Sequence, residues 1–421
     1  MMIRTSSSMF WNNFAKMLLV MTASTSFVTP QLHAESADLE PYAAEIAESK
    51  FFDLLVNKYD LGSGGPQVVA VSDEIFVARR ESDLVRVFVE SKNTLVQTQV
   101  VQLPKVDDEL AGAGKYILDL ETRGNTDLFV SYLEFYDDRA ECEHVVVLQF
   151  KVSNKRVIPS SARRVFTSTP CWSQIRKESL EVGYTASGRL AVDGERLFIE
   201  GGMVMIGLGH NLYPNPGIVG LSGNFKRDVA STNLFGSVTE VNLKTLKYEK
   251  LSKGHRNPQG LSWDQYRKIL WSSEHGPSGG CELNIIKKGK NYGWPAVSLG
   301  REYFAEDLLP ANNSLKTKYG THVGYELPAF AWNPSIGPSQ LVVVPSKHPF
   351  GPVWTHDLLL STLGDRSIYR ITPDKGGKII AMEQIVIGHR IRDLAIGASG
   401  LWASTDDGKL LSLKRFVSPA N

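Results

Sequence analysis

Leu261-Ser262-Trp263-Asp264-Gln265-Tyr266-Arg267-Lys268-Ile269-Leu270-Trp271 joins an alternating apolar segment, a polar turn and a second apolar segment. This unit recurs six times, with its first segment at residues 69–71, 118–120, 190–192, 261–263, 341–343 and 394–396. Period-two alternation between polar turns indicates antiparallel strands. One unit cannot bury both faces of its sheet, whereas units arranged radially cover each other. The sequence therefore predicts an all-β fold, a six-bladed β-propeller, over residues 65–415.

Two packed β-sheets are the alternative, but they explain the strands without the sixfold recurrence. The last blade, residues 394–413, is expected to be completed by a strand from elsewhere in the chain, because an unpaired edge invites aggregation. Residues 35–64 are predicted to be an N-terminal extension with one short helix at residues 43–59, where Ile46, Phe51, Leu54 and Leu55 have helical spacing. Residues 416–421 are expected to form a tail.

The first 34 residues resemble an export signal. Arg4 and Lys16 precede or begin a short apolar segment, residues 17–28, and Leu32-His33-Ala34 offers a small-residue cleavage site. A retained membrane anchor is the weaker alternative, because the segment is too short to span a bilayer. The expected mature protein is periplasmic or secreted, with no membrane attachment after cleavage.

The charge balance excludes partners that need a basic surface. The chain has 46 Lys and Arg against 45 Asp and Glu, and removing residues 1–34 takes away Arg4 and Lys16 and no acid, leaving 44 against 45. A net charge near −1 gives no reason to expect binding to nucleic acid.

Three cysteines are present. Cys142 and Cys171 are predicted to pair in an oxidising compartment, with two unpaired buried thiols as the alternative. Cys281 would then be left without a partner.

Four motifs that place amide, guanidinium and imidazole groups beside glycines crowd into residues 254–295. They are Gly254-His255-Arg256-Asn257-Pro258-Gln259-Gly260-Leu261, Glu274-His275-Gly276-Pro277, Glu282-Leu283-Asn284 and Asn291-Tyr292-Gly293-Trp294-Pro295. This run resembles the soluble glucose/sorbosone (aldose sugar) dehydrogenases, which depend on calcium and pyrroloquinoline quinone (PQQ). The resemblance implies an exported quinoprotein that oxidises a sugar or related alcohol by hydride transfer to calcium-bound PQQ. The substrate would be a small molecule, and the electron acceptor is unknown.

The resemblance also assigns site residues. It places Arg256, Asn257, Gln259, His275, Arg390 and Arg392 at the cofactor. It gives the carbonyls of Gly276 and Pro277 to the calcium beside the cofactor, and Glu282 and Tyr292 to a second calcium. Planar guanidinium and amide groups suit a flat, carboxylated ligand, and alternation lets Arg390 and Arg392 reach one anion. The alternatives are ordinary turns at residues 256–259 and 276–277 and a surface charge stripe with Asp393.

Several positions depart from the family pattern. Thr185 stands at the position of the general base, and a neutral hydroxyl cannot accept a proton usefully near pH 7. Gly364 replaces a lysine, Cys281 replaces an acid, and Gly202 replaces an aspartate. We therefore expect weak or no activity on ordinary aldoses, unless His210, His255 or His275 substitutes as base. The alternative function is a non-catalytic propeller that binds a carbohydrate or protein. A lactonase-type propeller is a distant third.

Overall fold

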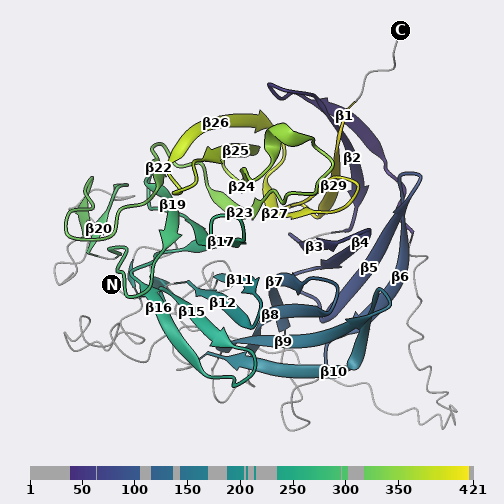
Figure 1. Cartoon of the computed structure of the whole chain (residues 1–421), viewed down its shortest axis with the longest axis horizontal. Coiled ribbons are helices and arrows are strands. Elements are labelled where there is room, and N and C mark those ends of the chain that lie inside the picture. Colours follow the sequence, from purple (N-terminus) through teal and green to yellow (C-terminus); the bar gives the residue numbers. More distant parts are fainter. Residues whose placement is uncertain are drawn as a thin grey trace, which may run out of the picture. The chain divides into compact units, whose positions relative to one another are not determined.

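The computed structural model describes residues 38–62, 64–104, 115–135, 143–168, 187–202, 205–206, 213–214, 235–294, 296–301 and 317–416. In this part of the chain six sheets surround a common axis, each with its first strand innermost (Figure 1). The predicted all-β, six-bladed propeller is confirmed. The described residues contain no α-helix and one 3₁₀ turn at Pro352–Trp354, and none of their helices is long and apolar enough to cross a membrane.

The first three blades are four-stranded antiparallel sheets. From the axis outward they contain β3 (Gln67–Val71), β4 (Glu74–Ala78), β5 (Leu84–Ser91) and β6 (Thr94–Gln102); β7 (Lys115–Arg123), β8 (Asp127–Phe135), β9 (Glu143–Ser153) and β10 (Arg156–Thr167); and β11 (Ser187–Asp193), β12 (Arg196–Gly201), β15 (Ser237–Asn242) and β16 (Tyr248–Lys253). The short strands β13 (Met205–Ile206) and β14 (Tyr213–Pro214) pair separately.

The fourth and fifth blades have the same form, and the sixth has a fifth strand. They contain β17 (Pro258–Asp264), β18 (Ile269–Glu274), β19 (Cys281–Ile286) and β22 (Phe330–Trp332); β23 (Pro338–Val343), β24 (Leu358–Thr362), β25 (Ser367–Pro373) and β26 (Ile379–Val386); and β27 (Ile391–Ile396), β28 (Leu401–Thr405), β29 (Lys409–Arg415), β2 (Leu54–Asp60) and β1 (Ala43–Ala47). A separate parallel pair joins β20 (Val297–Ser298) to β21 (Lys318–Tyr319).

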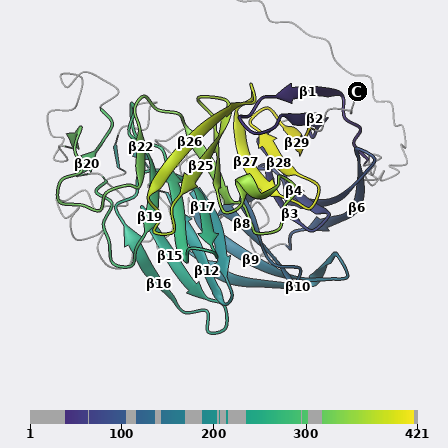
Figure 2. The same cartoon turned by 45° about the horizontal axis from the view of Figure 1, so that its top comes forward.

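The expected helix at residues 43–59 is wrong, because this segment forms β1 and β2. Strand β2 pairs antiparallel with β29, so that Val56 faces Leu413, and β1 lies outside β2 (Figures 1 and 2). Leu54 and Val56 are fully buried at alternate positions. Pairing with the free edge of β29 gives the segment hydrogen bonds and burial that outweigh its local helical pattern. The sixth blade is thus closed by a distant strand, as expected, but that strand comes from the predicted extension.

The sequence repeats lie on the two innermost strands of each blade, where side chains are buried on both faces. Trp271 of β18 and Trp402 of β28, for example, are 0% and 1% exposed. Six buried apolar clusters fill the six interfaces between neighbouring blades. Removal of apolar surface from water between blades is therefore the main force that closes the ring.

In each blade the innermost strand begins at the end of the propeller at which the second strand finishes. Ser187 faces Gly201, Pro258 faces Glu274, and Ile391 faces Thr405. We call this end of the propeller, where the inner strands begin, the mouth. Loops that precede an inner strand or follow a second strand open onto it.

Some sequence predictions fall outside the described residues. These are the export signal in residues 1–34, the Cys142–Cys171 pair, and the positions of Thr185 and His210, all of which remain predictions. Cys281 is buried as a free thiol, and its Sγ lies 2.8 Å from the hydroxyl of Ser335.

Candidate functional site

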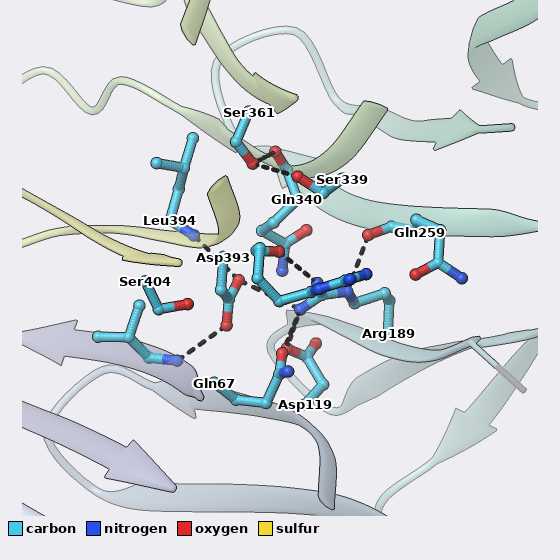
Figure 3. Close-up of polar contacts among 12 residues, drawn as sticks. Gln67, Asp119, Arg189, Gln259, Ser339, Gln340, Ser361, Asp393, Leu394 and Ser404 are labelled. Carbon is cyan, nitrogen blue, oxygen red and sulfur yellow. Dashed lines mark hydrogen bonds and ion pairs between the residues drawn. The ribbon is translucent and has the colours of Figure 1, made fainter. Parts of the chain in front are cut away.

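One arginine lies on the propeller axis. Arg189 of β11 is 2% exposed, and its guanidinium donates hydrogen bonds to residues of four other blades (Figure 3). The acceptors are Oε1 of Gln67 (2.8 Å), Oδ1 of Asp119 (2.8 Å), Oδ1 of Asp393 (3.1 Å) and the backbone carbonyls of Gln259 (2.8 Å) and Arg392 (2.9 Å). The rigid fork of one guanidinium therefore holds the first residues of several inner strands together.

Two buried carboxyl groups face this guanidinium. Asp119 also accepts a hydrogen bond from the backbone N–H of Leu190, and Asp393 accepts one from that of Val68, both at 2.8 Å. Burial raises the pKa of Asp119 to about 7 against the opposing charge of Arg189, and burial also raises the pKa of Asp393. Both side chains are closed off from solvent, so they support the site without facing a ligand.

The motif at residues 254–261 places Arg256 at the mouth, just before β17. Its Nη1 donates to the carbonyls of His275 (3.1 Å) and Gly276 (3.0 Å), and its backbone N–H donates to Glu274 Oε2 (2.7 Å). The guanidinium carbon lies 5.2 Å from the ring centroid of Trp294, a cation–π contact. Its Nε is buried without a hydrogen-bond partner in the described part of the chain, which leaves one directional donor for a ligand.

His275 is fixed in one tautomer. Its Nε2 lies 2.5 Å from the carbonyl oxygen of Pro338, which only accepts, so Nε2 carries the proton and Nδ1 keeps its lone pair. The backbone N–H of His275 donates to the Asn257 carbonyl, while the Asn257 side chain accepts from Gln259 Nε2 at 2.7 Å. The three polar residues assigned here by the sequence therefore form one connected group with Arg256.

The paired arginines before and in β27 share one carboxylate. Asp406 Oδ2 accepts from Arg390 Nε at 3.0 Å, and Oδ1 accepts from Arg392 Nε at 2.9 Å and also from its Nη2. The side chain of Arg390 is 49% exposed, whereas that of Arg392 is 6% exposed. Both do reach one anion, but it belongs to the chain itself. Asp393 turns to the axis instead, so the alternative of a surface stripe does not describe this pair.

The structure brings the two motifs together at the mouth. The carbonyls of Gln259 and Arg392 both bind Arg189. Burial, helped by the charges of Arg392, Arg256 and Arg390, lowers the pKa of His275 to about 4. The imidazole is therefore neutral at pH 7 and lies within electrostatic range of all three guanidiniums.

A small cavity lies beside the Gly276 turn, and Arg256 and His275 are among the residues that line it. It has a volume of about 20 Å³ and is lined by both residues assigned to a second calcium, Glu282 and Tyr292, and by Glu274, Gly276 and His322 among others. Glu282 accepts from Asn284 at 3.1 Å and faces His322 Nε2 at 3.1 Å. A space of this size admits one water or one small ion.

His255 belongs to the core. It is fully buried between the Ser252 hydroxyl and Glu274, at 2.8 and 3.2 Å, and stacks on Tyr292. It therefore cannot serve as the substitute base.

Gly364, one of the positions expected to depart from the family pattern, lies in tightly packed backbone. A Cβ on Gly364 would lie 2.7 Å from the Ile336 carbonyl oxygen, so the family's lysine does not fit without a shift of this loop. Gly202 follows the end of β12 and carries no side chain that could act as an acid. The neighbouring Glu200 is fully buried instead of facing the mouth.

Sequence reasoning missed three residues that matter here: Arg189, Asp406 and Arg80. Arg189 had a signal, since it directly precedes the repeat segment at residues 190–192. Asp406 and Arg80 each follow the second strand of a blade, β28 and β4, which is the position of His275 and Gly364 in their own blades. The blade repeat would have identified both.

Comparison with known proteins agrees with this geometry. The sequence model for glucose/sorbosone dehydrogenases matches residues 66–412. The chain belongs to this family. It is 31% identical to the aldose sugar dehydrogenase YliI of Escherichia coli over 247 residues, covering 58% of this chain and 62% of that protein. Over 94 residues it is 38% identical to quinoprotein glucose dehydrogenase B of Acinetobacter calcoaceticus, covering 21% of this chain and 20% of that protein. Each match thus spans less than two thirds of the relative.

Solved structures share the propeller. An apo form of the soluble aldose sugar dehydrogenase of E. coli superposes with a TM-score of 0.61 at 24% identity, covering 86% of this chain and 100% of that one. The PQQ-bound aldose sugar dehydrogenase of Streptomyces coelicolor superposes with a TM-score of 0.54 at 16% identity, covering 90% and 99%. At these identities the likeness establishes the fold of the glucose/sorbosone dehydrogenase family.

Proposed function

We propose that this family member is an exported quinoprotein that oxidises a sugar or related alcohol by hydride transfer to calcium-bound PQQ, with weak or no activity on ordinary aldoses. The observation that carries the proposal is the gathering of Arg256, Gln259, Arg390 and Arg392 at one mouth, although more than a hundred residues of sequence separate the two motifs. Periplasmic or secreted localisation rests on the signal-like residues 1–34.

The donors at the mouth fit a flat ligand with several carboxylates. Arg256 Nε is buried and has no hydrogen-bond partner among the described residues, and an unsatisfied buried donor costs roughly 1–3 kcal/mol. A ligand carboxylate would remove that cost and would be held by directional, charge-assisted hydrogen bonds. PQQ, when bound, supplies the hydride acceptor. Arg256, Asn257 and Gln259 would orient it from the fourth blade, and Arg390 and Arg392 from the sixth.

The residues assigned to calcium offer hard oxygen ligands. The Gly276 and Pro277 carbonyls would hold the ion beside the cofactor, and Glu282 with the Tyr292 carbonyl would hold a second ion. Oxygen-only ligation is what calcium prefers. Within the described ranges no three acidic, His or Cys side chains cluster as metal ligands, so backbone carbonyls would have to supply part of each shell. The Gly276 carbonyl already accepts from Arg256, which leaves its second lone pair for an ion.

The weak point of the site is proton transfer. Thr185 cannot accept the substrate proton, and the absence of a general base costs roughly 10²- to 10⁴-fold in rate. His275 has a free Nδ1 lone pair, but a pKa lowered to about 4 makes it a poor base. The mouth is thus better equipped to hold the cofactor than to turn over an aldose.

The second candidate is a non-catalytic propeller that keeps the cleft for a carbohydrate or protein ligand. It is favoured by Gly202 and Gly364, which carry neither the acid nor the lysine of the family.

An equilibrium titration of the purified protein with PQQ, followed by cofactor absorbance with and without calcium, tests the proposed function. We expect saturable, calcium-dependent binding that weakens roughly tenfold or more in Arg256→Gln, because a charge-assisted hydrogen bond is lost. Arg156→Gln, a change at an exposed position on β10, should bind as the unmodified protein does. No calcium-dependent uptake would refute the quinoprotein reading and leave the non-catalytic binder.

A further inference from the structure

The blade repeat assigns equivalent positions around the mouth. Within two residues of the end of a blade's second strand lie His275 and Gly276 in the fourth blade, Gly364 in the fifth and Asp406 in the sixth. All of these positions already belong to the candidate site or contact it. In the first blade the second strand is β4, which ends at Ala78 opposite Gln67 of the axis cluster. Arg80, two residues beyond that end, therefore opens onto the same mouth.

Arg80 is held in a defined position. Its backbone carbonyl accepts from the N–H of Ile117 at 2.7 Å, so it is tied to the start of the second blade. Its Nη1 donates to the Tyr116 hydroxyl at 3.2 Å, and its guanidinium carbon lies 5.5 Å from the Tyr116 ring centroid. Tyr116, the second residue of the inner strand β7 in the neighbouring blade, thus supports the guanidinium.

The guanidinium of Arg80 is buried and forms no ion pair with any carboxylate in the part of the chain that the structure describes. The residue is 7% exposed, and its Nε is buried with no hydrogen-bond partner among the residues that the structure describes. Its charge acts on the neighbouring sixth blade, since burial and the charge of Arg80 lower the pKa of Arg392 to about 10. Two acids at this end of the propeller have other partners: Asp393 pairs with Arg189, and Asp406 pairs with Arg390 and Arg392.

We propose that Arg80, supported by Tyr116, binds a carboxylate of the ligand at the mouth. The carboxylate comes either from the quinone cofactor or from an acidic sugar such as a uronate. With Arg80, four guanidiniums surround the mouth, and Asp406 pairs with two of them. Buried charge of one sign is stable only when an anion compensates it. Among the residues that the structure describes, Arg80 and Arg256 each have a buried Nε without a hydrogen-bond partner. The inference rests on the proposed function for the identity of the site.

The test compares four proteins: the unmodified chain, Arg80→Gln, Arg80→Lys and the control Arg79→Gln. Arg79→Gln removes the same charge one residue away, but the guanidinium of Arg79 lies toward Gly62. Each protein is titrated with PQQ in calcium by absorbance, and with glucuronate and glucose by calorimetry, in both apo and quinone-loaded forms. Arg80→Lys keeps the charge without the planar fork, and it serves as the test variant if Arg80→Gln fails to fold.

If the cofactor supplies the carboxylate, Arg80→Gln weakens PQQ binding roughly tenfold or more, Arg80→Lys weakens it less, and Arg79→Gln leaves it unchanged. If the substrate supplies it, PQQ binding stays the same while glucuronate loses its advantage over glucose in Arg80→Gln alone. The inference is overturned if Arg80→Gln changes the affinity for neither PQQ nor glucuronate, or if Arg79→Gln lowers the affinity by the same factor. If the unmodified chain takes up no PQQ, the proposed function is wrong. The role of Arg80 is then tested by the titration of the apo proteins with glucuronate alone. If Arg80→Gln does not change glucuronate binding in that titration, the inference about Arg80 is overturned.

Discussion

The guanidinium Nη1 of Arg189 lies 2.8 Å from the Asp119 carboxylate on the propeller axis, and both side chains are almost fully buried. The pair joins the third blade to the second. The same guanidinium reaches the fourth and sixth blades, so the candidate cofactor residues Gln259 and Arg392 depend on it for their position.

Replacing Arg189 should therefore destabilise the protein strongly. Arg189→Met leaves Asp119 and Asp393 as buried, unpaired acids, and breaking one side of a buried ion pair costs about 3–5 kcal/mol. Chemical denaturation of Arg189→Met beside Arg156→Met, an exposed control, measures the difference. A loss below about 1 kcal/mol would show that the axis cluster does not hold the blades.

Asp406→Asn should lower stability mainly near neutral pH. Although burial opposes the shift, the charges of Arg392 and Arg390 hold the pKa of Asp406 below its ordinary value of 3.8. A carboxyl with a lowered folded-state pKa adds stability above its unfolded pKa and loses it as pH falls through the folded value. Thermal melts should show a deficit of about 1–3 kcal/mol at pH 7 that shrinks below pH 3.8. A deficit that is independent of pH would contradict the ion-pair account.

Glu200→Gln should have the opposite effect. Burial, helped by the charge of Glu274, raises the pKa of Glu200 well above 4.5. The folded protein therefore keeps this proton while the unfolded chain releases it, so stability falls as pH rises above 4.5. Glu200→Gln removes that penalty, and its melting temperature should exceed that of the unmodified protein by a margin that grows with pH. Glu48→Gln, at an exposed position, should have the same melting temperature as the unmodified protein at every pH. If the Glu200 carboxyl were ionised in the folded protein, Glu200→Gln would show no such growing margin, and this result would contradict the prediction.

The sequence predicts what depends on near neighbours in the chain. The repeats carry both the alternation and the turns of the inner strands, and Arg256 finds His275 and Gly276 within twenty residues. It fails where the partner is distant. Residues 43–59 have helical spacing, but Leu54–Asp60, which overlaps this segment, pairs with Lys409–Arg415. The axis position of Arg189 requires inner strands from the whole chain to meet.

We propose that the mouth keeps residues able to hold the cofactor, while Thr185 leaves it without the proton acceptor of the family. Binding and turnover can separate in this way, because only contacts that strengthen in the transition state speed a reaction. Restoring a base with Thr185→His should recover little, since the acid and lysine are replaced as well.

Dye reduction by the PQQ- and calcium-loaded protein, with glucose and other aldoses, tests this claim most directly when the bound quinone is quantified in the same sample. The account predicts stoichiometric quinone with turnover at least about 10²-fold below that of A. calcoaceticus quinoprotein glucose dehydrogenase B assayed in parallel. Robust turnover by the unmodified protein would contradict it and would mean that another residue, with His210 and His275 as the first to replace, accepts the proton.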